Sequence, residues 1–238
     1  IDEVSVNNSP LRLRVISSIY DDSPCAPLDF NTAHDYGLVV TPNTEAPVAR
    51  VSNESYTVGK DVKVTFNHNS LHKPTSYKWY FENGIPETST DENPIVVWDS
   101  IGVYDARLIV ENAFGSDTLN LEDYVKVLPA FYLGTDVSTY LNEGILYDTG
   151  GDSANYSNNE SFEFLVDSPC DSVIEFTIHY TDLAKEDYFE VYNNENTFNA
   201  TESIRTGPKL SNVQRVYSGD QLLIRLLSDS SITESGFA

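Results

Sequence analysis

The stretch from Tyr77 to Thr118 constrains the fold of this chain more than any other part of the sequence. Short runs of aromatic and β-branched residues follow one another there with short connections, and turns rich in Gly, Pro, Asn and Asp separate the runs. The runs read WYF, IVVW and DARLIVE, and the turns between and after them include ENG, NP and NAFG. Strand-length runs at this spacing are typical of a β-sandwich.

The rest of the chain shows the same kind of pattern. No stretch longer than about ten residues has clean helical periodicity, whereas alternating aromatic and β-branched runs dominate. A length of 238 residues leaves room for one to three domains of about 100–150 residues each. We therefore predict an all-β chain of tandem β-sandwich modules.

The charge of the chain excludes some classes of partner. It has 14 basic and 37 acidic residues and a formal net charge of −23. Nucleic acid is excluded because its binding needs clustered Lys and Arg that release counterions, and an anionic membrane surface is disfavoured for the same reason. No apolar run approaches the ~20 residues that span a bilayer, so we expect no membrane insertion. The acidity indicates either a soluble, self-repelling secreted surface or a surface that collects Ca²⁺.

The lack of methionine and the scarcity of cysteine bear on the origin of the chain. The chain begins at Ile1 and holds no methionine, so we expect it to be an internal or processed piece of a longer polypeptide. Its two cysteines, Cys25 and Cys170, leave three alternatives open. They form one intrachain disulfide, stay reduced, or pair with a partner outside the chain.

Residues 46–128 resemble a PKD domain, an immunoglobulin-like module of secreted and surface proteins, from end to end. The resemblance rests on WYFENG, which stands where the family has the core motif WDFGDG, and on the strands and turns that follow. It implies an extracellular or cell-surface location. It also implies a spacer or binding module and not a catalyst.

Residues 131–238 resemble a CUB domain, a compact jelly-roll β-sandwich of extracellular proteins. The best-matching pieces are GILYDTGG with NYSNNE, DYFEVY and LLSDSSITESGFA. Many members hold Ca²⁺ between loops at one end. The resemblance implies Ca²⁺ ligands at Asp187 and Asp229, with Asp182 as the third where the family has a Glu. The alternative is that Asp182 and Asp187 are solvated loop residues and Asp229 caps a turn.

The N-terminal segment carries two predicted strands, 11–17 and 35–41, which cannot bury a core alone. LRLRV, the loop cysteine Cys25 and FNTAHDYGLVV resemble the closing half of a GEVED domain, a small β module of bacterial secreted proteins. A proline-containing linker follows near residue 44, and a second boundary lies near Pro129. The predicted domains are 1–43, 44–129 and 130–238.

The two tryptophans are candidate binding residues only where they are exposed. Trp79 lies within an aromatic strand and is predicted to be core. Trp98 ends its predicted strand beside Asp99. It is therefore either a core residue or a partly exposed aromatic that stacks on a sugar or inserts into a protein groove.

The sequence holds no recognised catalytic motif. HExxH, Gly-x-Ser-x-Gly, the P-loop and Gly-x-Gly-x-x-Gly are absent. His68 and His72 are four residues apart but lie in a predicted loop, where that spacing does not bring two zinc ligands together. We predict that this chain is not itself an enzyme.

The order GEVED-like, PKD-like and CUB-like is similar to the accessory tails of secreted bacterial metallopeptidases. It implies a region that binds an extracellular protein or polysaccharide, spaces the domains and assembles with neighbouring domains of the same polypeptide. The alternative is a structural module of an adhesin or surface appendage, in which the sandwiches serve cell adhesion as rigid repeats.

Overall fold

The computed structural model describes residues 11–17, 32–38, 44–136, 138–139, 142–152, 154–168, 173–193, 202–205, 210–218 and 221–238. Every regular element in these ranges is a β-strand, which confirms the predicted all-β class. Within the same ranges, no helix is long and apolar enough to cross a membrane. Cys25 and Cys170 lie outside the described residues, so their three alternatives stay open.

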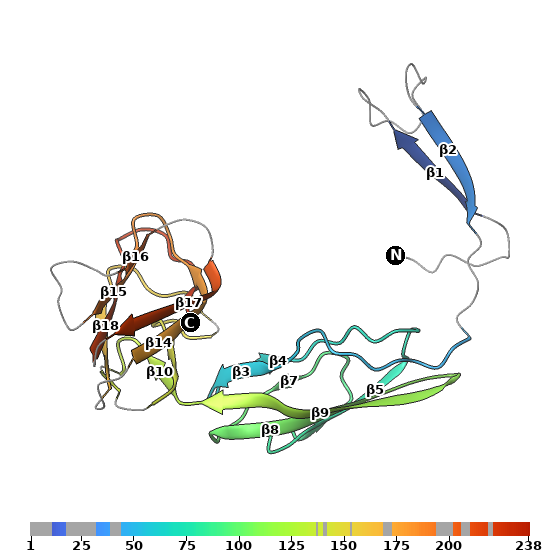
Figure 1. The fold of residues 1–238 in the computed structure, drawn as a ribbon, viewed down its shortest axis with the longest axis horizontal. Coiled ribbons are helices and arrows are strands. Elements are labelled where there is room, and N and C mark those ends of the chain that lie inside the picture. Colours follow the sequence, from blue (N-terminus) through green and yellow to red (C-terminus); the bar gives the residue numbers. More distant parts are fainter. Residues whose placement is uncertain are drawn as a thin grey trace.

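The first two strands form an antiparallel hairpin, β1 (Leu11–Ser17) with β2 (Thr32–Leu38) (Figure 1). The pairing runs from Leu11 opposite Leu38 to Ser17 opposite Thr32, so every residue of β1 has a partner. The second strand therefore begins before Asp35, where the sequence pattern placed its start. Residues 39–41 of the predicted strand lie outside the described residues.

The middle of the chain forms two sheets, which together we call the middle sandwich (β3 to β9). The larger sheet has the order β3-β9-β8-β5-β6, with the bounds Tyr56–Gly59, Gly115–Leu128, Gly102–Asn112, Ser76–Phe81 and Thr88–Ser89. The smaller sheet pairs β4 (Val64–Thr65) with β7 (Ile95–Val96) in antiparallel fashion.

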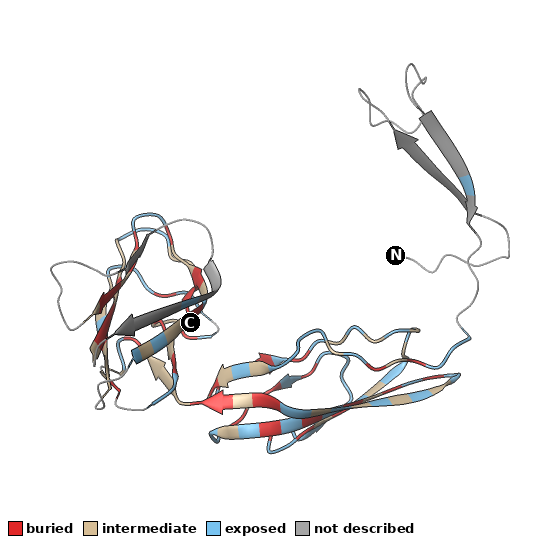
Figure 2. Cartoon of the chain, in the orientation of Figure 1, coloured by how far each residue is buried: buried red, intermediate tan, exposed pale blue. Residues whose placement is uncertain are grey.

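Strand alternation turns one face of the larger sheet toward a core and leaves the other face to solvent. Along β8, Tyr104, Ala106, Leu108 and Val110 are buried while the residues between them are exposed or half-buried. Figure 2 shows how buried and exposed segments alternate along the strands of this sheet. Side chains of both sheets meet in this core, among them Trp79, Leu108, Val64 and Val96. Two sheets that share one core in this way form a sandwich.

The last part of the chain forms a second sandwich-like unit, the C-terminal sandwich (β10 to β19). β10 (Ala130–Tyr132) and β12 (Ile145–Tyr147) pair in parallel. A five-stranded sheet has the order β11-β13-β18-β15-β16, with the bounds Ser138–Thr139, Ser161–Asp167, Gln221–Leu227, Tyr188–Asn193 and Glu202–Arg205. A three-stranded sheet has the order β17-β14-β19, with the bounds Leu210–Ser218, Val173–Asp182 and Gly236–Phe237.

Both of these sheets contribute to one core. Phe164, Phe189 and Leu226 come from the five-stranded sheet, and Phe237 comes from the three-stranded sheet. The Phe189 and Phe237 ring centroids are 4.6 Å apart. This shared core gives the sandwich-like packing that the sequence predicted, whereas the CUB-like character and the domain boundaries remain predictions.

A third apolar cluster joins the two sandwiches. Val62 and Leu128 from the middle sandwich pack with Ile145 and Tyr147 from the C-terminal one. The Tyr147 hydroxyl accepts a hydrogen bond from the Gly59 N–H at 3.2 Å. A Cβ at position 59 would lie 2.9 Å from the Tyr147 ring, so the close approach needs glycine.

Candidate functional site

The outer face of the larger sheet in the middle sandwich carries an aromatic residue between two cations. In β5, Trp79 and Phe81 point into the core, and Lys78 and Tyr80 therefore lie on the opposite, solvent face. Arg107 in β8 is paired directly with Tyr80 across the two strands. The register of β5 and β8 thus places the three side chains Lys78, Tyr80 and Arg107 together.

The contacts of Tyr80 are electrostatic as well as apolar. The Arg107 guanidinium carbon lies 4.1 Å from the Tyr80 ring centroid, and the Lys78 Nζ lies 5.0 Å from it. Both distances are within the range of cation–π attraction. A hydrogen bond from Lys78 lowers the pKa of the Tyr80 phenol, with Arg107 adding to the effect.

Tyr80 and Arg107 line an open groove of about 600 Å³ on this face. The other lining residues come from β5, β6, β8, β9 and the turn after β5: Phe81, Glu82, Asn83, Glu87, Thr88, Asp105, Ala106, Asn120, Leu121 and Glu122. A second hollow of about 440 Å³ shares Thr88 with the groove and also borders on Lys78 and Ser89. We call the larger of these two hollows the Tyr80 groove.

A β-bulge shapes one end of the Tyr80 groove. The register between β8 and β9 shifts between Tyr104 and Ala106, at Asp105, and such bulges re-aim the side chains next to them. The Asp105 N–H donates to Glu82 Oε2 at 3.1 Å, and Asp105 Oδ1 accepts from the Asp123 N–H at 2.8 Å. These bonds hold the carboxylates of Glu82 and Asp105 at the rim of the Tyr80 groove.

The structure decides between the two alternatives for Trp98. Its side chain is 1% exposed and belongs to the core, and its Nε1 donates to the Glu82 carbonyl at 2.9 Å. The alternative that Trp98 is a partly exposed aromatic that binds a ligand is therefore wrong. Val96 and Trp98 both point inward because the alternation of β7 continues past its last paired residue. Tyr80, the residue after Trp79, is half-buried on the outer face of the sheet, which the WYF alternation could have indicated.

The three predicted Ca²⁺ ligands lie in the C-terminal sandwich in unequal settings. Asp187 is fully buried. Its Oδ2 accepts from the Tyr156 hydroxyl at 2.6 Å, and its Oδ1 accepts from the Asp229 N–H at 2.7 Å. Burial and the bond to Asp187 raise the pKa of Tyr156. Asp187 is thus no solvated loop residue.

Asp229 and Asp182 have different roles. Asp229 Oδ1 accepts from the Ser231 N–H at 2.7 Å and from the Ser231 hydroxyl at 2.9 Å, which is the geometry of a turn cap. Asp182 Oδ2 accepts from the Ser235 hydroxyl at 3.1 Å. Among the described residues, no three His, Cys, Asp or Glu side chains are grouped so that they could hold a metal ion. The fold therefore brings Asp187 and Asp229 together, and the Ca²⁺ site remains a prediction.

One buried carboxylate at this unit was not predicted. Asp148 is fully buried, with Oδ2 accepting from the Phe237 N–H at 2.7 Å and Oδ1 from the Gly150 N–H at 2.6 Å. Burial raises the pKa of Asp148 to about 6, and the nearby charge of Glu160 adds to the rise. Nothing in the local sequence signals this contact, because Phe237 lies far along the chain.

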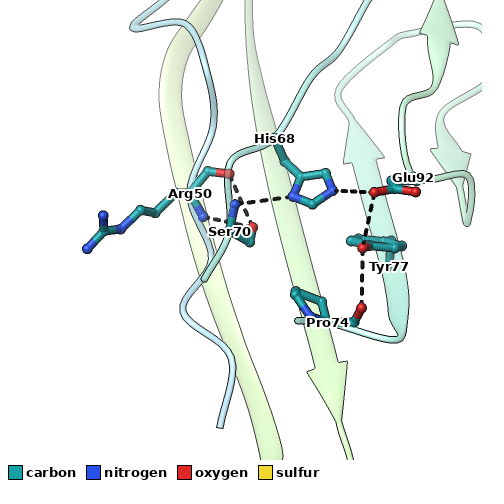
Figure 3. A network of polar contacts seen from close by, with 6 residues as sticks. All are labelled: Arg50, His68, Ser70, Pro74, Tyr77 and Glu92. Carbon is teal, nitrogen blue, oxygen red and sulfur yellow. Dashed lines mark hydrogen bonds and ion pairs between the residues drawn. The ribbon is translucent and has the colours of Figure 1, made fainter. Parts of the chain in front are cut away.

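The histidines of the middle sandwich serve separate networks. His68 Nδ1 accepts from the Ser70 N–H at 3.2 Å, so the neutral ring carries its proton on Nε2, which lies 3.4 Å from Glu92 Oε1 (Figure 3). The His68 ring packs 4.7 Å from the Tyr77 ring. His72 Nδ1 instead lies 2.9 Å from the Ala46 carbonyl oxygen. The two rings thus have different partners.

Comparison with known proteins supports the prediction for the middle part of the chain. Residues 44–127 match the PKD domain family. No curated protein matches the chain.

Two solved structures show a remote likeness. The structure titled "Structural basis for the promiscuous specificity of the carbohydrate-binding modules from the beta-sandwich super family" is 16% identical, with a TM-score of 0.30; the match covers 82% of this chain and 98% of that one. The secreted serine protease VesC from Vibrio cholerae is 9% identical, with a TM-score of 0.28; the match covers 79% of this chain and 48% of that one. Likenesses this remote carry no argument about function.

Proposed function

We propose that this chain is a non-catalytic accessory region of a larger secreted protein, which binds an extracellular protein or polysaccharide and spaces the domains beside it. The PKD domain at residues 44–127 supports this role, since such modules are typical of extracellular proteins. A secreted bacterial metallopeptidase is the proposed parent protein. A surface adhesin or appendage is the alternative.

The observation that carries the binding role is the Tyr80 groove. Its wall combines aromatic rings, a guanidinium group, two side-chain amides and several carboxylates on a sheet face that is open to solvent. Binding sites commonly combine a stacking surface with a few placed polar groups in this way. The supporting sheet is rigid because its opposite face is packed into the PKD core.

The spacing role rests on the contact between the two sandwiches. Three interactions cross this contact: the shared apolar cluster, the Gly59–Tyr147 hydrogen bond and the Lys126–Glu143 ion pair. The distance between Lys126 Nζ and Glu143 Oε2 is 2.6 Å. A junction with its own buried cluster resists bending more than a flexible linker does. Binding sites on the two sides would therefore keep a fixed separation.

Calcium binding by the C-terminal sandwich forms part of the same proposal. The donors to the buried Asp187 carboxylate are a phenol and a backbone amide, both of them neutral. A buried carboxylate is costly without a counter-charge, and Ca²⁺ prefers oxygen ligands. Asp187, Asp229 and Asp182 are the proposed ligands.

The experiment that tests the binding role uses the purified chain on arrays of polysaccharides and extracellular matrix proteins. We expect saturable binding to at least one class, and no turnover of peptide or glycoside substrates over the same range of conditions. Lack of binding to every arrayed ligand would remove the binding role. Turnover that survives purification and is abolished by one substitution would remove the non-catalytic assignment.

A further inference from the structure

We propose that the Tyr80 groove binds an uncharged polysaccharide chain, with the ring of Tyr80 and the guanidinium of Arg107 as its central contacts. This inference rests on the proposed binding function and narrows it to one site and one class of ligand. The groove belongs to the solvent face of the PKD sheet, away from the residues predicted to bind Ca²⁺.

The stacked pair Tyr80–Arg107 gives the groove a flat, pre-positioned surface. Arg107 is exposed and yet lies over the ring at 4.1 Å, which limits the conformations of a side chain that otherwise has high rotamer entropy. Among the described residues, no carboxylate lies within ion-pair distance of Arg107 or Lys78. Arg107 also donates a hydrogen bond to the Tyr80 phenol, and its remaining donors are available to a ligand.

The carboxylates of the groove disfavour polyanions, and the two cations at its central ring disfavour a positively charged group there. Glu82, Glu87, Asp105 and Glu122 line it together with the single cation Arg107. Four carboxylates repel a polyanion such as a polyuronate, as does the net charge of −23. A cationic peptide would have to seat a positive group against Arg107 and Lys78, the two cations that lie at the central ring.

Sugar hydroxyls suit this mixture of groups because each hydroxyl both donates and accepts hydrogen bonds. Carboxylates of Glu87 and Glu122 accept from hydroxyls, whereas Arg107 and the Asn120 amide donate to them. The C–H face of a sugar ring packs on the flat surface that the planar Arg107 guanidinium forms over the Tyr80 ring. The second hollow, which shares Thr88, extends the surface so that more than one sugar unit can lie along it.

The test is a titration of the whole, isotopically labelled chain, followed by ¹⁵N–¹H spectra, with five neutral hexasaccharides: cellohexaose, xylohexaose, mannohexaose, maltohexaose and chitohexaose. We expect at least one to shift the resonances of β5, β8 and β9 around Tyr80. Tyr80→Ala should weaken its binding about tenfold. Arg107→Lys, which keeps the charge but loses the planar stacking surface, should weaken it as well.

Three controls separate the alternatives. Tyr36→Ala removes an exposed tyrosine of the N-terminal hairpin, outside the groove, and should leave binding unchanged. Glu111→Gln removes a charge from an exposed residue of β8 that does not line the groove, so it should change neutral-glycan affinity less than about threefold. Raising the salt concentration should also have little effect, since no ionic contact with the ligand is screened.

The outcomes that overturn the inference are distinct from those that overturn the binding role. If oligogalacturonate or oligolysine shifts the groove resonances and no neutral hexasaccharide does, the ligand class is wrong while a binding role for the groove stands. If a glycan binds but Tyr80→Ala binds it equally well, the site is wrong. If none of the five sugars shifts the groove, the inference fails, and the array experiment decides the proposed function separately.

Discussion

At the scale of single residues, Asp148 shows how the last strand is tied into the C-terminal sandwich. Its carboxylate accepts hydrogen bonds from the N–H groups of Phe237 and Gly150. Gly236 has a positive φ of 77°, and a Cβ there would lie 1.8 Å from Asp148 Oδ2. The buried carboxylate and the adjacent glycine therefore form one interlocking contact.

Asp148 should make the stability of the chain depend on pH in a defined direction. Its pKa is raised to about 6 in the folded state from an ordinary value of 3.8. The folded state thus binds more protons than the unfolded state between these values, so stability from this group increases as the pH falls through about 6. We expect wild type to gain about 1–2 kcal/mol relative to Asp148→Asn between about pH 7 and pH 5.

Urea denaturation of the two proteins at both pH values measures this difference directly. Comparing them cancels the other titrating groups, which both proteins share. An equal difference in unfolding free energy at the two pH values would show that Asp148 does not titrate in this range.

Gly236→Ala should destabilise the C-terminal sandwich strongly. The substitution combines a left-handed backbone with a direct clash on Asp148, and we expect a loss of at least about 2 kcal/mol in unfolding free energy. Gly151→Ala is the matched control. Its φ is a similar 69°, but its Cβ would meet only the Tyr132 ring at 3.2 Å. Equal losses in both variants would leave only backbone strain as the cause.

At the scale of elements, the loops that carry Asp187 and Asp229 meet through a backbone N–H and not through two carboxylates. Asp229 uses Oδ1 to cap its own turn, and Asp187 uses both oxygens in buried bonds. Binding of Ca²⁺ would have to compete with these bonds or share the oxygens with them. The change in melting temperature on adding Ca²⁺ measures the outcome of that competition.

Calcium should raise the melting temperature of the chain if these loops bind it. A ligand present at about 100 times its Kd stabilises the folded state by about 2.7 kcal/mol. Asp229→Asn keeps an oxygen that can cap the Ser231 turn but removes the charge, so it should abolish most of the calcium effect. Asp99→Asn, an exposed change in the PKD domain, should leave it intact. Identical melting of wild type with excess calcium and with chelator would contradict the proposed site.

The sequence anticipated elements better than it anticipated the site. Runs such as WYF and DARLIVE lie in β5 and β8 because their alternation directly encodes one buried face. Trp98 was ambiguous because the sequence alone did not show that the alternation of β7 continues past its end at Val96. Tyr80 depended on a neighbouring strand to bring Arg107 to it. Asp148 depended on Phe237, and no local pattern encodes a contact across that distance.

At the scale of the whole molecule, the two sandwiches share a buried seam. The Tyr147 hydroxyl is buried, which raises its pKa to about 12, and it satisfies the Gly59 N–H. Tyr147 also stacks on Tyr132 with 5.4 Å between ring centroids. The seam therefore couples the orientation of the PKD domain to that of the sandwich that follows.

Loosening this seam should free the two units from each other. Gly59→Val would place side-chain atoms where Tyr147 and Ala130 now lie. We expect residual dipolar couplings of the wild-type units to fit one alignment tensor and those of Gly59→Val to need two. Tyr147→Phe should cost about 1–3 kcal/mol, because it leaves a buried N–H unpaired. Two separate tensors in the wild type would disprove a rigid spacer.

The central claim is that this chain binds an extracellular ligand through the solvent face of its PKD sheet. The most direct test compares wild type with Tyr80→Ala/Arg107→Ala in surface plasmon resonance against the array ligand that wild type binds best. Both side chains lie outside the core, so circular dichroism and melting temperature should stay unchanged. We predict that the double variant loses at least about 90% of the affinity, a change of about 1.4 kcal/mol or more. Equal affinity of the two proteins would contradict the claim.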